Sequence, residues 1–151
     1  MQLKNLPYKS EIRFKQEVLD TLLTYKQGHN GSETGGVLLG QVYTDGGIIV
    51  CRCSDPCIAG KADKKGFSRS SKTANKIIND AFVGSNGTIL YVGEWHTHPE
   101  PYPRPSTTDK TSIEEIYRTA NINNSNLIYV IVGEIDIFCG VYDGKTHYRV
   151  P

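Results

Sequence analysis

Residues 88–109 have the sequence TILYVGEWHTHPEPYPRPSTTD, which joins three kinds of local structure in one short run. Residues 88–95 are rich in β-branched and aromatic side chains, and this composition predicts a buried strand. The four prolines within residues 99–105 predict a stiff, non-helical crossing, because proline fixes φ and disfavours helical backbone at the residue before it. A helix is predicted to begin at residue 106 and to end near residue 120.

Two histidines follow the predicted strand directly, and they indicate a metal site. Side chains at i and i+2 of an extended strand point to the same face, about 6 to 7 Å apart, so His96 and His98 can converge on one ion. The helix start after the prolines can deliver Asp109 as a third ligand. Three protein ligands leave a fourth position for water, as in catalytic zinc sites, and two nitrogens with one oxygen suit zinc better than magnesium or calcium.

The same residues also allow a purely structural interpretation. Ser106 and Asp109 have the spacing of a helix capping box, with aspartate in the place of the usual glutamate. A His-x-His pair can also occur by chance. Capping and metal binding are compatible, however, since Ser106 can cap the helix while Asp109 faces the ion.

The rest of the chain predicts strands and helices in an irregular order. The predicted strands cover residues 11–14, 35–40, 48–53, 127–133, 137–141 and, at an edge, 147–150; the predicted helices follow residues 18–23, which Gly28 can end, and 72–82. Because no steady βαβ rhythm appears, we expect an α+β fold with a mixed, mostly antiparallel sheet flanked by helices. A length of 151 residues fits a single domain, residues 1–151.

Composition and charge restrict the classes of partner. The formal net charge is +1, which predicts no broad surface for nucleic acid or for an anionic membrane. No apolar run reaches the roughly 18 residues of a membrane span, and residues 1–11 are polar, unlike a secretory signal. We therefore expect a cytoplasmic protein whose four cysteines are free structural thiols, with Cys51 and Cys53 on one strand face.

Glu33 with Gly35-Gly36 before a strand, then His96-x-His98-Pro99, then Ser106-x-x-Asp109, together resemble the JAMM motif of the JAB/MPN family of zinc metallopeptidases. Every element of the motif is present and in order. The resemblance implies a JAB1/MPN-like fold over nearly the whole chain. It also implies zinc-dependent hydrolysis of amide or isopeptide bonds, often at the C-terminus of ubiquitin or a ubiquitin-like protein, with one Zn²⁺ per chain.

Within the family, the chain resembles the bacterial JAB peptidases of CBASS antiphage operons, which are encoded with E1/E2-like proteins. This likeness implies a deubiquitinase-like isopeptidase in antiviral defence. Its substrates would be the C-terminal tail of a ubiquitin-like or cGAS-like nucleotidyltransferase protein and the conjugates of that tail, and the E1/E2-like ligase would be associated through the operon.

The resemblance also assigns roles to residues. Glu33 would be the general base that passes a proton from water to the leaving amine, and the Ser106 hydroxyl would help zinc to stabilise the oxyanion. Glu94 could instead be the general base, or it could support one of the zinc ligands, because strand alternation sets it on the same face as the two histidines. Glu100 is a weaker candidate for the general base.

Two further interpretations concern the surroundings of the metal site. The basic loop at residues 59–69 can line the cleft, and Phe67 and Arg69 alternate in a way that could grip an extended substrate. Trp95 should face away from the metal and belong to the core.

Parts of the sequence also suggest three other functions. His98-Pro99-Glu100 imitates the H-x-E signature of zinc nucleobase deaminases, but their later P-C-x-x-C is missing, since only Cys139 follows. A non-catalytic MPN scaffold should have lost a ligand or the glutamate, whereas all five motif positions are present. Maturation of a sulfur-carrier protein would use the same site, and the sequence does not separate it from deconjugation.

Overall fold

The structure, a computed structural model, describes residues 11–26, 33–57, 71–120 and 126–150. The strands are β1 (Ile12–Phe14), β2 (Gly35–Val42), β3 (Ile48–Cys53), β4 (Leu90–Thr97), β5 (Leu127–Val132), β6 (Ile137–Tyr142) and β7 (His147–Val150), and the helices are α1 (Gln16–Thr24), α2 (Ser71–Gly84) and α3 (Thr107–Thr119). The predicted elements are therefore present in the predicted order, with ends that differ by a few residues.

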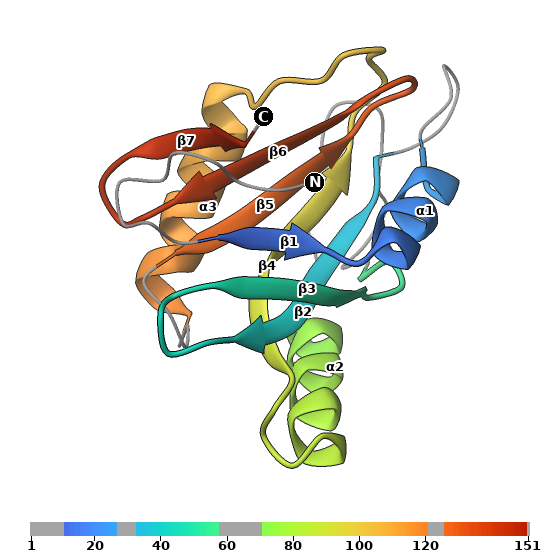
Figure 1. The fold of residues 1–151 in the computed structure, drawn as a ribbon. Coiled ribbons are helices and arrows are strands. Elements are labelled where there is room, and N and C mark those ends of the chain that lie inside the picture. The colour runs from blue at the N-terminus through green and yellow to red at the C-terminus, as the bar shows by residue number, and fades with distance from the viewer. Residues whose placement is uncertain (1–10, 27–32, 58–70, 121–125, 151) are drawn as a thin grey trace.

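The strands form one sheet in the order β1-β3-β2-β4-β5-β6-β7 (Figure 1). β1 runs parallel to β3 and β4 runs parallel to β5, while the other four pairings are antiparallel. This arrangement confirms the expected mixed, mostly antiparallel sheet flanked by helices.

Helices cover both faces of the sheet, and each face has its own core. On one face, Val18 and Leu22 project from successive turns of α1 into a cluster that includes Trp95. On the other face, α2 contributes Ala74 and Ala81, and α3 contributes Ile113. All six residues of β5 are buried, as expected for a central strand with both faces covered. Each buried aliphatic side chain stabilises the fold by about 1.5–3 kcal/mol.

Trp95 belongs to the core, as predicted. Its side chain is 1% exposed and stacks on Tyr25, with ring centroids 5.0 Å apart. Among the residues that the structure describes, no helix combines the length and the apolar character needed to cross a membrane.

One expectation about the cysteines is wrong. Cys51 packs against the cluster under α2 and α3, whereas Cys53 packs against the cluster under α1. The reason is a β-bulge: Leu39 pairs with Arg52 and Gly40 with Val50, so Cys51 has no partner across the strand and the alternation shifts by one.

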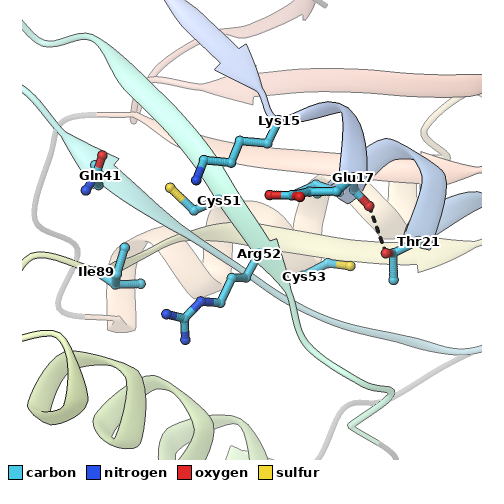
Figure 2. Close-up of a pocket in the computed structure, with 9 residues that line it drawn as sticks. Lys15, Glu17, Thr21, Gln41, Cys51, Arg52, Cys53 and Ile89 are labelled. Carbon is cyan, nitrogen blue, oxygen red and sulfur yellow. Dashed lines mark hydrogen bonds between the residues drawn. The ribbon is translucent and has the colours of Figure 1, made fainter.

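The two cysteines nevertheless border one shallow hollow beside α1 (Figure 2). All four cysteines of the chain are free thiols. Burial raises the pKa of the Cys53 and Cys139 thiols, so these two remain protonated and unreactive near neutral pH.

Candidate metal centre

The two histidines lie side by side at the end of β4. The backbone of His96 pairs with Gly35 of β2, and the amide of His98 donates to the Val132 carbonyl of β5 at 3.0 Å. Neighbouring strands therefore hold both residues. Their Nε2 atoms are 3.2 Å apart, so the two rings do converge on one point from a common strand face.

Asp109 completes this group from the first turn of α3. Its Oδ1 lies 3.3 Å from Nε2 of His96, and its Oδ2 lies 3.2 Å from Nε2 of His98. In the described part of the chain, these three side chains form a group whose ligand atoms all lie within 4.8 Å of one another. The group can hold a metal ion.

The capping box is also closed. The amide of Asp109 donates to Oγ of Ser106 at 3.1 Å, and the amide of Ser106 donates to Oδ2 of Asp109 at 2.8 Å. The cap fixes the position of the carboxylate, so Asp109 can cap the helix and face a metal ion at the same time.

The proline crossing brings this helix start back to the end of β4. Its backbone is bonded to the turn between β5 and β6: the amide of Glu134 donates to the Glu100 carbonyl at 2.7 Å, and that of Asp136 donates to the Pro101 carbonyl at 3.0 Å. Gly133 permits the close approach, because a Cβ there would lie 2.4 Å from Cδ of Pro103.

Electrostatics keep Asp109 in the form that binds a cation. Burial alone would raise the pKa of this carboxyl, but hydrogen bonds with His96 and His98 and the charge of His96 hold it well below its usual range. Burial would lower the pKa of His98, yet the Asp109 bond and the charges of Asp109, Glu33 and Glu100 raise it. A metal ion would replace protons in this acidic environment.

Glu33 enters the site through the pairing of β2 with β4. Gly35 lies opposite His96, and the amide of Thr97 donates to the Thr34 carbonyl at 2.9 Å. Continuing this register sets Glu33 across from His98, on the face of both histidines. Glu33 is buried and borders the same groove as the three candidate ligands.

The two rival glutamates occupy different places. Glu94 is buried in the floor of the groove, and its Oε2 accepts a hydrogen bond from the Tyr91 hydroxyl. A bulge at Val92 makes this contact possible, because it brings residues three apart onto one face. Glu100 lies at the rim, half exposed, with Oε1 3.5 Å from Nδ1 of His98.

The groove has a volume of about 1010 Å³ and extends from the histidines along α3. Hydroxyl and carboxylate side chains of α3 border it at Thr108, Asp109, Thr111, Ser112, Glu115 and Thr119, and the first two turns of α2 add Ser71 and Asn75. Sequence reasoning missed this polar stripe of α3, although its spacing of three and four residues was visible. Phe67 and Arg69, the predicted substrate contacts, lie outside the described residues.

Comparisons with known proteins agree with this geometry. The family of prokaryotic homologues of the JAB domain matches residues 15–143. A CD-NTase/cGAS isopeptidase of Vibrio cholerae is 36% identical over 129 residues, which are 82% of this chain and 76% of the relative. A CD-NTase/cGAS isopeptidase of Escherichia coli is 33% identical over 135 residues, 88% of this chain and 83% of the relative.

The fold is shared with a solved structure. The solution structure of protein DSY2949 from Desulfitobacterium hafniense superposes with a TM-score of 0.60 at 18% identity, covering 91% of this chain and 88% of that chain. At this identity the likeness concerns the fold alone.

Proposed function

The chain belongs to the family of prokaryotic homologues of the JAB domain, and from this premise we propose that it is a zinc-dependent isopeptidase that releases a CD-NTase from its conjugates. The chain is a JAMM-type isopeptidase and therefore a hydrolase, and it is one of the bacterial JAB peptidases of CBASS operons. The substrate proposal rests on two relatives, each more than 30% identical over most of the chain, that are named for this activity. The bond cleaved would follow the C-terminus of the nucleotidyltransferase and join it to a target protein.

The donor atoms of the candidate ligands support zinc. One ligand atom each from His96, His98 and Asp109 lies within 4.8 Å of the other two, so the three side chains can reach a single ion. Magnesium and calcium prefer oxygen ligands alone. Two imidazole nitrogens and one carboxylate oxygen also match the donors that zinc prefers.

The chemistry follows from where the side chains lie. A bound zinc ion would make water more acidic and polarise the scissile carbonyl. Glu33 would accept the proton of the attacking water and return it to the departing amine. Oγ of Ser106 accepts one hydrogen bond from Asp109, and its own hydrogen remains available to donate to the developing oxyanion.

We also propose that the reaction takes place in the cytoplasm. The support is chemical: all four cysteines are free thiols, which is the expected state in a reducing compartment.

Cleavage of a defined fusion tests the proposal. A CD-NTase carrying a second protein fused to its C-terminus would be incubated with the wild-type protein, with Glu33→Ala, and with wild type plus a zinc chelator. We expect a new fragment that ends at the native C-terminal residue of the CD-NTase, seen by mass spectrometry and absent in both controls.

A parallel fusion of a ubiquitin-like sulfur carrier separates the two substrate classes. Cleavage of the carrier and not of the CD-NTase would overturn the proposed substrate. No cleavage of either fusion by zinc-loaded protein, under conditions in which a CD-NTase/cGAS isopeptidase relative cleaves its own, would contradict the proposed activity.

A further inference from the structure

The second ring nitrogen of His98 needs an acceptor. Its Nε2 faces His96 and Asp109, so ligation through this atom leaves the ring proton on Nδ1. Nδ1 is buried and has no hydrogen-bond partner among the described residues. A buried N–H without an acceptor costs about 1–3 kcal/mol. The ring will therefore be held in place only if a nearby group accepts this hydrogen.

Glu100 is placed to be that acceptor. Its Oε1 lies 3.5 Å from Nδ1 of His98, and it is the acid recorded within 4 Å of that atom in the described part of the chain. The backbone of Glu100 is fixed, since its carbonyl accepts the Glu134 amide at 2.7 Å. Its side chain is 53% exposed and can rotate, so a shift of about half an ångström makes a normal hydrogen bond.

We propose that Glu100 is a positioning residue that accepts the Nδ1 hydrogen of His98 and thereby fixes the ring orientation for the metal. Carboxylates commonly hold metal-bound histidines in this way, and their loss typically costs about 10- to 100-fold in metal affinity. The inference rests on the proposed metal centre and adds to it a residue outside the motif. It gives Glu100 a different role from the general base that the sequence also allowed, because Glu100 would act through His98.

Zinc affinity is the direct measurement. Metal-free wild type, Glu100→Ala and Glu100→Gln would be titrated with zinc against a chromophoric chelator. We expect zinc to bind Glu100→Ala about 10- to 100-fold more weakly than wild type. We expect Glu100→Gln to stay within about threefold of wild type, because its amide oxygen still accepts the hydrogen. Asp80→Ala removes the same charge from an exposed site on α2 and should leave zinc affinity unchanged.

Cobalt substitution supplies a readout independent of activity. The visible absorption of Co²⁺ bound at this site reports ligand geometry, so we expect an altered spectrum in Glu100→Ala and the wild-type spectrum in Glu100→Gln. Thermal unfolding of the metal-free variants shows whether each is folded.

Two results would overturn the inference while leaving the zinc centre intact. One is equal zinc affinity and equal cobalt spectra for wild type and Glu100→Ala. The other is a loss in Glu100→Gln as large as in Glu100→Ala, which would mean that charge matters and the acceptor does not. A wild-type protein that binds neither metal would instead overturn the metal centre and this inference together.

Discussion

The carboxylate of Asp109 takes part in helix capping and, in the proposed function, also in metal binding. Oδ2 accepts the Ser106 amide and also faces His98, while Oδ1 faces His96. One residue of α3 is therefore both part of the helix cap and a candidate metal ligand. A neutral side chain of the same shape at this position can separate the two roles, because capping depends on shape and metal binding on charge.

Asp109→Asn should remove the metal and keep the cap. An amide oxygen can still accept the Ser106 N–H, but the neutral side chain is a poor ligand. We expect loss of zinc binding and of cleavage. The metal-free protein should stay folded with its cap, while the weakened contacts with His96 and His98 should lower its free energy of unfolding by about 1–3 kcal/mol. Chelator competition and urea unfolding measure the two effects. Unimpaired zinc binding by Asp109→Asn would contradict the ligand role.

Glu33 and Glu94 can be separated by matched substitutions. Glu33→Gln should lower kcat by about 10²- to 10⁴-fold, because no carboxylate would remain to carry the proton. Glu94→Gln should reduce kcat much less, since Glu94 is buried and accepts a hydrogen bond from Tyr91. Both variants should bind zinc, which atomic absorption would verify. The reverse ranking of kcat would transfer the general-base role to Glu94.

At the scale of elements, the local parts of the site were predictable and the long-range parts were not. Strand alternation predicted the common face of His96 and His98, and capping-box spacing predicted the cap at Ser106. The place of Glu33 depends on the register between β2 and β4, strands about 50 residues apart along the chain, so only the family motif indicated it. Bulges depend on pairing too, which explains the error about Cys51.

Gly133 links the proline crossing to the metal group. A Cβ at this position would lie 2.4 Å from Cδ of Pro103 and 2.7 Å from the Glu100 carbonyl oxygen. Gly133→Ala should therefore cost about 1–3 kcal/mol as an overpacked contact and should also weaken zinc binding by displacing the backbone next to His98. Gly84→Ala is the matched control, because a Cβ there has open space. If Gly133→Ala and Gly84→Ala had the same stability and the same zinc affinity, the proline crossing would accommodate the added methyl group and the prediction would be wrong.

At the scale of the whole molecule, His147 joins three distant parts of the chain. Its Nδ1 lies 3.0 Å from the Tyr129 hydroxyl of β5, and its Nε2 lies 2.9 Å from Glu114 of α3. The last strand is thereby tied to the centre of the sheet and to the helix that begins at the metal group. These partners are 18 and 33 residues from His147 in sequence, so no local pattern could have indicated them.

Burial of Tyr129 makes the stability of the molecule sensitive to alkaline pH. Burial, with smaller contributions from the charges of nearby groups, raises the pKa of Tyr129 to about 12 from its usual 10.0. The unfolded chain then loses this proton before the folded chain does, so the stabilisation is fully present below pH 10 and is lost as pH rises toward 12. Tyr129→Phe should be less stable at pH 8, by about 1 kcal/mol for the lost hydrogen bond. The difference from wild type should narrow above pH 10 and change sign before pH 12, because a shift of about two pKa units outweighs the lost hydrogen bond; urea unfolding across this range would measure it. A constant difference at every pH would show that Tyr129 ionises as easily in the folded state as in the unfolded one.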